Sequence, residues 1–155
     1  MVSVKQFTQD KIDGVMEFEQ ELRRQEPGTF FMDAGDGYRK LLEKSFSDGR
    51  FTNALSLLAY EGGRVIGRID ASIIAARSDA CCCCAYLDWI CVLKEERHRQ
   101  VAQLLLKELR RELKERGVET LVAIMAHNPE SIRFYKAVEY ASIHDEAVWM
   151  DCNEN

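Results

Sequence analysis

Two apolar runs separated by a pair of glycines constrain this chain more than any other feature. Residues 54–60 (ALSLLAY) and 64–76 (RVIGRIDASIIAA) flank the sequence Glu61-Gly62-Gly63, which is a clear signal for a β-hairpin. A third run, residues 82–93 (CCCAYLDWICVL), is almost entirely apolar, as a central buried strand should be. The three runs therefore predict consecutive strands of one sheet, beginning with an antiparallel pair.

A helix and a further strand follow these runs. From about Val101, apolar residues recur along one helical face, and Gly117 supplies a C-terminal stop. Residues 118–126 are predicted to form the next strand. A strand–helix–strand crossover joined to an antiparallel hairpin implies a mixed sheet with helices on both faces. The apolar face of the helix comprises Val101, Leu104, Leu105, Leu109 and Leu113.

The two ends of the chain complete this pattern. Residues 2–7 alternate like a strand, and residues 8–25 have helical apolar spacing that ends at Pro27-Gly28. Residues 37–46 predict a second, shorter helix. After the central crossover, residues 128–138 predict a short helix and residues 146–152 a last strand. We therefore expect one α/β (α+β) domain over residues 1–155, with the order β-α-α-β-β-β-α-β-α-β.

Length and composition agree with this expectation. A chain of 155 residues has the usual size of one domain, and 46% hydrophobic with 30% charged residues is typical of a soluble globular protein. No apolar run approaches the ~20 residues that a membrane helix needs. The N-terminal sequence lacks a basic patch followed by an apolar core. We expect a cytoplasmic protein.

Six cysteines raise the question of disulfides or metal. Four are consecutive, Cys81 to Cys84, and neighbours in a strand point to opposite faces, so the run cannot easily bridge itself. In a reducing cytosol they are expected to pack as small apolar residues. Cys81 and Cys84 form a CxxC pair without a second pair at zinc spacing. We expect no metal; redox or metal sensing stays open on composition alone.

The charge distribution is uneven. A net charge of −5 argues against a general nucleic-acid partner. Residues 94–116, however, hold eight Lys and Arg against five Glu, a local net charge of +3. This segment is either a site for a polyanion or a solvated helix face, and charge alone leaves both interpretations open.

Residues 97–102 (RHRQVA) lie between a predicted strand and the long helix, and Asn128, Ser131, Phe134, Tyr135 and Tyr140 follow further along the chain. These two motifs, within residues 86–140, resemble those of the GCN5-related N-acetyltransferase (GNAT) superfamily. That family has a strand, a loop of the form R/Q-x-x-G-x-G/A and a long helix, followed later by N-x-x-A/S-x-x-F-Y-x-x-x-G-F. Here residues 97–102 (RHRQVA) occupy the loop. The order of elements agrees over nearly the whole chain. The resemblance implies a GNAT fold, a mixed and mostly antiparallel central sheet of about six to seven strands with helices on both faces. The later motif is matched by Asn128, Ser131, Phe134, Tyr135 and Tyr140.

The resemblance also implies a function. It points to an acetyl-CoA-dependent N-acetyltransferase that transfers an acetyl group to a primary amine of a small molecule or peptide by direct attack in a ternary complex. Its partners are then acetyl-CoA and the amine, with no metal, nucleic acid or membrane. The exposed edge of the final strands allows a homodimer. The resemblance assigns coenzyme binding to Ile90, Cys91, Val92, Arg97, His98, Arg99, Gln100, Val101, Ala102, Asn128 and Tyr135.

Different members of this set are expected to bind different parts of the coenzyme. A helix N-terminus offers unpaired N–H donors and the positive end of the helix dipole to the pyrophosphate. We expect Arg97 and Arg99 to add mobile positive charge beside it. By resemblance, the backbone of residues 90–92 pairs with the pantetheine arm like an added strand, and Asn128 hydrogen-bonds the same arm. On composition alone, Asn128 would be a helix cap.

The loop lacks the family's glycines. His98 and Gln100 stand where the family usually has Gly, and Glu139 stands at its later Gly. Gly permits close approach and positive φ. We expect instead that amides at ordinary negative φ face the phosphate, with His98 and Gln100 also donating hydrogen bonds. The replaced glycines support an alternative function, a non-catalytic acyl-CoA-binding or interaction module with the same fold.

The acyl transfer needs an acid and a base. Tyr135 stands at the family's general-acid position, where its hydroxyl would protonate the departing thiolate. Asp88 is the best-placed carboxylate for the base, since a carboxylate in an apolar strand needs a partner or a function. Asp70 ranks second, and deprotonation through water remains an equal possibility. His127 and His144 are further alternatives.

Acceptor choice in this superfamily resides in the first two helices, their loop and the last hairpin. The corresponding residues 17–38 mix carboxylates with two aromatic rings, which would suit a cationic amine. A solvated acidic helix face is the other interpretation. The residues concerned are Glu17, Glu19, Glu21, Glu26, Asp33, Asp36, Phe30 and Phe31.

Overall fold

The computed structural model of the chain describes residues 1–30, 32–75, 83–143 and 152. The chain forms two compact parts, Met1–Val122 and Ala123–Asn155, and each is described by itself. The last predicted strand, residues 146–152, lies outside the described residues except for Cys152.

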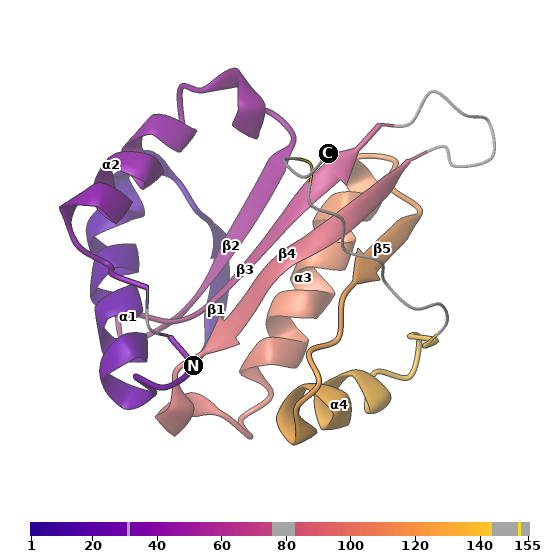
Figure 1. Ribbon diagram of the computed structural model, residues 1–155. Coiled ribbons are helices and arrows are strands. Elements are labelled where there is room, and N and C mark those ends of the chain that lie inside the picture. Colours follow the sequence, from indigo (N-terminus) through magenta and orange to yellow (C-terminus); the bar gives the residue numbers. More distant parts are fainter. Residues whose placement is uncertain (31, 76–82, 144–151, 153–155) are drawn as a thin grey trace. The chain divides into compact units, whose positions relative to one another are not determined.

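A five-stranded sheet organises the described chain (Figure 1). Its spatial order is the sequence order, and the first four strands are antiparallel neighbours. The predicted α/β class with a mixed sheet is confirmed, although the described residues contain five strands where six to seven were expected. The strands are β1 (Ser3–Gln6), β2 (Ala54–Glu61), β3 (Arg64–Ile74), β4 (Cys84–Val92) and β5 (Thr120–Ala123).

The predicted hairpin joins β2 to β3. Glu61 pairs with Arg64, so the connection is a two-residue turn. Gly62 and Gly63 have φ of 58° and 84°. Positive φ at both central positions is the type I′ geometry, whose twist matches that of the flanking strands. The glycine pair thus fixes the register of the two central strands.

Helices cover both faces of this sheet in the first part of the chain. In Figure 1, α1 (Ile12–Gln25) and α2 (Asp36–Ser45) lie on one face and α3 (Val101–Glu115) on the other. α1 and α3 each bury an apolar stripe, as their periodicity predicted, and α2 buries Leu42. Burying a large aliphatic side chain contributes about 1.5–3 kcal/mol, so these stripes hold the layers together. The fully buried side chains include Val15, Phe18, Leu22, Leu58, Ile66, Ile69, Leu93, Leu105 and Leu109.

The second part of the chain contains α4 (Pro129–Lys136). Asn128 precedes it in extended backbone, and its Oδ1 accepts a hydrogen bond of 2.8 Å from the Ser131 N–H. Pro129 fills the first turn, where a missing N–H costs nothing. The helix-cap interpretation of Asn128 is therefore confirmed.

Gly67 in β3 sets the distance between the sheet and α3. A Cβ at this position would lie 3.1 Å from Leu105 Cδ1, 3.2 Å from the Cys91 carbonyl oxygen and 3.3 Å from Val101 Cγ1. Two of these atoms belong to α3 and one to the β4 backbone, which cannot move aside. A side chain here would therefore push the first turns of α3 away from the sheet.

We expect Gly67→Ala to lower the free energy of unfolding by about 1–3 kcal/mol, because overpacking forces neighbouring groups apart. The urea midpoint should fall with an unchanged slope. Gly37→Ala is the matched control: Gly37 lies in α2 with no atom within 4 Å of an added Cβ, so this change should stabilise by up to about 1 kcal/mol. Equal midpoints for the two variants would contradict the packing argument.

Candidate functional site

The loop that enters α3 adopts a left-handed conformation twice. After β4, a 3₁₀ turn (Lys94–Glu96) leads to residues 97–100. His98 and Gln100 both have φ of 62°. The expectation of ordinary negative φ at these positions is therefore wrong. The backbone keeps the conformation that glycine favours, although an L-residue there costs roughly 1–2 kcal/mol.

This conformation leaves a row of backbone donors at the start of α3. Within the described parts of the chain, none of the six N–H groups from His98 to Gln103 donates a hydrogen bond, and the first helical bond runs from the Leu104 N–H to the Gln100 carbonyl at 2.9 Å. No side chain caps the helix, and its first turn holds no acid. Unpaired N–H groups at the positive end of a 15-residue helix are suited to an anion.

The two loop arginines were expected to be mobile, but the structure holds both of them in ion pairs. Arg97 binds the Glu26 carboxylate, with Nη1 3.1 Å from Oε1, and its side chain is 17% exposed. Arg99 is 47% exposed, and its Nη1 lies 2.8 Å from Glu61 Oε2; it also pairs with Glu96. The positive charge beside the amides is thus fixed in place and partly neutralised.

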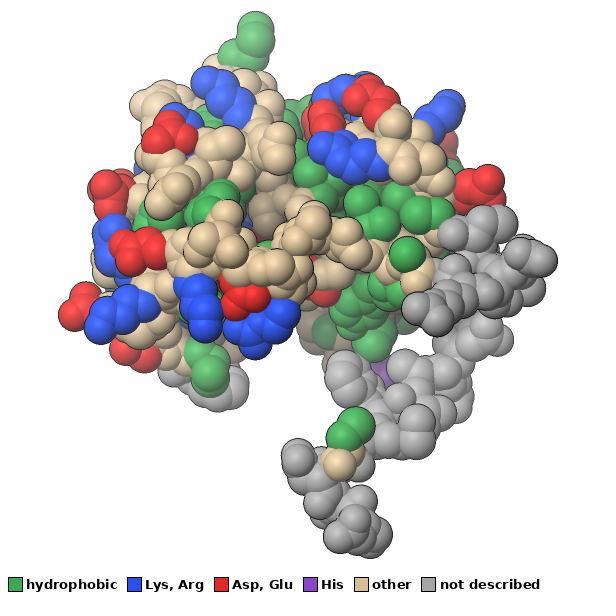
Figure 2. All heavy atoms as spheres, turned by 90° about the horizontal axis from the view of Figure 1, so that it is seen from above, with side chains coloured by type: hydrophobic (Ala, Val, Ile, Leu, Met, Phe, Trp, Pro, Cys, Tyr) green, Lys and Arg blue, Asp and Glu red, His purple; other side chains and the backbone are tan. Residues whose placement is uncertain are grey.

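Two further basic residues of this segment, Arg111 and Arg116, fit the solvated-face interpretation. Arg111 in α3 lies within 3.0 Å of carboxylates at Glu108, Glu112 and Glu115, and Arg116 pairs with Glu112. On the face drawn in Figure 2, basic and acidic side chains stand next to one another. These two arginines are thus paired with carboxylates, whereas the amides of residues 98–103 are not paired within the described chain.

The ladder between β3 and β4 decides which backbone groups of β4 face outward. The Leu93 N–H donates to the Ile66 carbonyl at 3.0 Å, and the register pairs Cys91 with Arg68. Because hydrogen-bonded pairs alternate in an antiparallel ladder, Cys91 bonds to β3, whereas Ile90 and Val92 direct their backbone groups away from it. The Val92 carbonyl accepts a bond of 3.2 Å from Arg97 Nε.

A β-bulge interrupts the same ladder at Asp88. Asp70 pairs with Trp89 and Ala71 with Leu87, so Asp88 is the extra residue. Asp88 and Trp89 are consecutive yet both exposed, because the bulge breaks the alternation of faces. Asp88 Oδ2 accepts a bond of 2.7 Å from Ser72 Oγ. The bulge therefore presents a carboxylate and an indole together.

The surroundings of Asp88 favour its protonated form. Partial desolvation raises the pKa of its carboxyl group, and the negative charge of Asp70 acts in the same direction, whereas the hydrogen bond from Ser72 opposes both. A carboxylate with a raised pKa is a stronger proton acceptor than an ordinary aspartate. Asp88 thus has the environment expected of a general base.

Asp70, the second candidate base, is occupied by a buried ion-pair network. Arg68 Nε lies 2.9 Å from Asp70 Oδ2, and Arg68 Nη1 lies 3.2 Å from Glu19 Oε1 and 2.6 Å from the Tyr38 hydroxyl. Arg23 also binds Glu19 at 2.6 Å. Glu19 and Arg68 are only 3% and 9% exposed. The network ties α1 and α2 to β3.

Sequence reasoning missed this network. Glu19 belongs neither to a solvated acidic face nor to an open cation site, because it is internal. One signal was available: Glu19 lies three residues after Met16 and three before Leu22, on the buried stripe of α1. Arg68 likewise interrupts an apolar strand. A charge on a buried stripe indicates a partner of opposite charge.

An aromatic pair flanks the bulge. The rings of Phe30 and Trp89 meet edge to face, with their centroids 5.7 Å apart. Phe30 lies in the segment that follows α1, so the ring contact joins this segment to β4. Of the aromatic residues considered at the acceptor side, Phe31 lies outside the described residues.

Asp88, Ile90 and the loop of residues 97–102 all belong to the first part of the chain. Asn128 and Tyr135 belong to the second part. There, Tyr135 is half-buried, and its ring meets that of Phe134 edge to face at 5.0 Å. His127 is exposed, and His144 lies outside the described residues.

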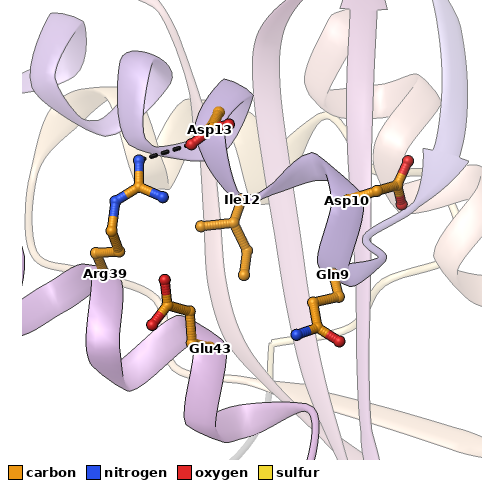
Figure 3. Close-up of a pocket in the computed structure, with 6 residues that line it drawn as sticks. All are labelled: Gln9, Asp10, Ile12, Asp13, Arg39 and Glu43. Carbon is orange, nitrogen blue, oxygen red and sulfur yellow. Dashed lines mark hydrogen bonds and ion pairs between the residues drawn. The ribbon is translucent and has the colours of Figure 1, made fainter.

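A pocket of about 310 Å³ lies at the start of α1, beside α2 (Figure 3). An ion pair of 2.7 Å joins Asp13 and Arg39 at its rim. No residue predicted for the coenzyme or for the chemistry lines it. Its lining consists of Gln9, Asp10, Ile12, Asp13, Arg39 and Glu43.

The cysteines carry no metal centre within the described residues, where no group of three potential ligands lies together. Cys83 and Cys84 are half-buried, and Cys81 lies outside the described residues. Burial raises the pKa of the Cys91 thiol to about 12, so this thiol stays protonated and unreactive. Among the described helices, none is both long and apolar enough to cross a bilayer.

Comparisons with known proteins agree with this geometry. A sequence model described as the acetyltransferase (GNAT) family matches residues 15–140. No curated protein matches the sequence. Among solved structures, aminoglycoside 6'-N-acetyltransferase AAC(6')-Ih from Acinetobacter baumannii is similar, with 17% identity, 100% of both chains covered and a TM-score of 0.75.

Two further structures show the same fold. AAC(6')-Iy, in complex with the bisubstrate analogue CoA-S-monomethyl-acetylneamine, has 19% identity over 97% of this chain and 98% of its own, with a TM-score of 0.74. Ribosomal-protein-alanine N-acetyltransferase from Brucella melitensis biovar Abortus 2308 has 15% identity, coverage of 97% and 99%, and a TM-score of 0.73. The family match over most of the chain, together with this fold, shows that the protein belongs to the GNAT family of acetyltransferases.

Proposed function

We propose that this protein is an acetyl-CoA-dependent N-acetyltransferase that acts on a primary amine of a small molecule or peptide by direct attack in a ternary complex. One observation carries the coenzyme-binding part of the proposal: His98 and Gln100 hold the left-handed backbone that frees six N–H groups at the start of α3. A chain that had lost its coenzyme would have no reason to keep two strained residues there. Membership of the family supports the same conclusion.

The residues fit the donor in two places. The amides of residues 98–103 suit the pyrophosphate, and Arg99, nearly half-exposed, adds charge beside them. On β4, the outward backbone groups of Ile90 suit the pantetheine amides, and those of Val92 face the same edge, whereas Cys91 between them pairs with β3. The full proposed set for the coenzyme is Ile90, Cys91, Val92, Arg97, His98, Arg99, Gln100, Val101, Ala102, Asn128 and Tyr135.

Two side chains have chemical roles in this proposal. Bound acetyl-CoA supplies an activated acyl carbon, to which the amine nitrogen bonds as the carbon–sulfur bond breaks. Asp88 accepts the proton that the amine must lose, for which its raised pKa suits it. The hydroxyl of Tyr135 donates a proton to the departing thiolate. No metal is required for these steps.

A thiol-release assay tests the proposal against the non-catalytic alternative. Acetyl-CoA binding is measured first by calorimetry, since both functions require it. Release of free thiol is then followed with simple amines, peptides and aminoglycosides as acceptors. Thiol release that depends on an amine supports the enzyme. Binding without release for every acceptor class, and no effect of Tyr135→Phe, would establish the binding module instead.

We expect the double variant His98→Gly/Gln100→Gly to bind acetyl-CoA within about threefold of the parent affinity and to be no less stable. Glycine relieves roughly 1–2 kcal/mol of strain per position and gives back ~0.5–1 kcal/mol in chain freedom. Calorimetry and urea unfolding measure the two effects. A tenfold loss of affinity would mean that the side chains, rather than the main chain, hold the anion. Gln100→Val, β-branched at positive φ, should lose both affinity and stability.

Tyr135→Phe should lower kcat by roughly 100- to 10,000-fold, because general acid assistance typically contributes that much. The affinity for acetyl-CoA should change little. Tyr140→Phe serves as the control, since this side chain in the same part of the chain is 54% exposed. Steady-state thiol release and calorimetry measure the two constants. Equal kcat values for the two variants would show that Tyr135 is not the general acid.

The pH profile should depend on Asp88 and Ser72. The base must be deprotonated to act, so activity falls as the pH drops through its raised pKa. Ser72→Ala removes the bond that lowers this pKa and should move the acid limb of kcat/KM to higher pH. Asp88→Asn should abolish that limb and most of the activity. Ser47→Ala, whose hydroxyl bonds only locally to Lys44, should leave the profile unchanged. An acid limb that persists in Asp88→Asn would assign the base elsewhere.

A further inference from the structure

We propose that Glu26 is a positioning residue that couples two parts of the site through Arg97. One is the coenzyme loop (residues 97–102), and the other is the acceptor side (Phe30 with Trp89, next to Asp88). The inference rests on the proposed function, because it assigns a role within that reaction. Arg97 belongs to the family's loop motif, but Glu26 lies outside both family motifs. The physical basis of the inference is a half-buried ion pair at the point where α1 ends.

The side chain of Glu26 holds the coenzyme loop. Both of its carboxylate oxygens meet the two terminal nitrogens of Arg97, and both side chains are only 17% exposed. A bidentate and partly desolvated pair fixes the orientation of the guanidinium far better than a solvated pair. Arg97 is the first residue of the loop, so its orientation sets where the following amides begin.

Two further bonds lock the same junction. Arg97 Nε donates to the Val92 carbonyl at 3.2 Å, so the guanidinium bridges the end of β4 and the end of α1. Gln25, the neighbour of Glu26, accepts a bond of 2.7 Å from the Lys94 N–H. Gln25, the last residue of α1, and Glu26, which follows it, therefore hold the two ends of the turn over residues 94–97.

The main chain of Glu26 holds the acceptor side. Its carbonyl accepts bonds of 3.0 Å from the N–H groups of Thr29 and Phe30. Phe30 in turn packs its ring on Trp89, beside the proposed base Asp88. One residue thus fixes the coenzyme loop through its side chain and the aromatic pair through its backbone. A displacement at either end is transmitted to the other through Glu26.

The ion pair between Arg64 and Glu95 provides a matched control. It reaches the same turn as the Glu26–Arg97 pair, with a separation of 3.0 Å, but its side chains are 47% and 49% exposed. Exposed pairs contribute little. It has no described contact with the segment that carries Phe30. Glu95→Gln therefore removes a carboxylate from this turn without disturbing the coupling.

The test compares Glu26→Gln with Glu95→Gln. Glu26→Gln should raise both the Kd of acetyl-CoA and the KM of the acceptor amine by about tenfold, the value of one charged hydrogen bond, with kcat changed less than threefold. Glu26→Asp should recover part of both constants. Arg97→Gln combined with Glu26→Gln should be no worse than either single variant, because the pair acts as a unit. Glu95→Gln should leave both constants unchanged.

A spectroscopic readout keeps this inference separate from catalysis. In a Trp149→Phe background, the emission of Trp89 reports on the aromatic pair. Addition of coenzyme A should shift that emission in the parent but not in Glu26→Gln, even if no amine releases thiol. If no amine releases thiol but coenzyme A still shifts the Trp89 emission in the parent and not in Glu26→Gln, the proposed reaction is wrong and the coupling is supported. An unchanged acceptor KM, or an emission shift in Glu26→Gln as large as in the parent, would overturn the coupling.

Discussion

The close approach of α3 to the sheet at Gly67 governs the geometry of the loop over residues 97–100. Val101 and Leu105, in the first turns of α3, lie against the space that a side chain at this position would fill. The helix body is buried behind them, so its N-terminus has little freedom to tilt or slide. A cluster of N–H groups binds an anion well only when its direction is fixed before the anion arrives. Tight packing on the sheet supplies that direction, and the loop supplies the unpaired donors.

Under the proposed function, main-chain recognition also explains how the chain does without the family's glycines. The amides keep their orientation as long as φ stays positive, whichever side chain is attached. His98 and Gln100 are exposed, so their side chains extend into solvent and need no space inside the protein. The cost is strain, which the packed helix on one side and the Arg97–Glu26 pair on the other can support. Charge beside the loop is correspondingly modest, because each arginine already has a carboxylate partner.

Local patterns predicted most of the architecture. Apolar periodicity located α1 and α3, and the glycine pair located the β2–β3 turn, because each depends on neighbouring residues alone. The features that were mispredicted or missed depend on distant residues. The φ of His98 and Gln100 is imposed by two fixed ends of a short loop, and the partners of Glu19 and Arg68 come from separate elements. The bulge at Asp88 follows from the register with β3, which no single strand encodes. Asp88 was chosen as the candidate general base from the sequence, because a carboxylate in an apolar strand needs a partner or a function. That role stays a prediction.

The bulge has a consequence for how β4 tolerates change along its length. In a regular strand, odd and even positions face opposite sides of the sheet. The extra residue at Asp88 reverses this assignment, so odd positions before it and even positions after it share a face. Before this point, Ala85 and Leu87 are buried; after it, Cys91 and Val92 are both buried, on opposite faces. The two halves of the strand therefore obey separate sets of constraints. Substitutions upstream are constrained by core packing alone, whereas the half from Trp89 onward must also keep the ring contact with Phe30 and, under the proposed function, the edge for the coenzyme.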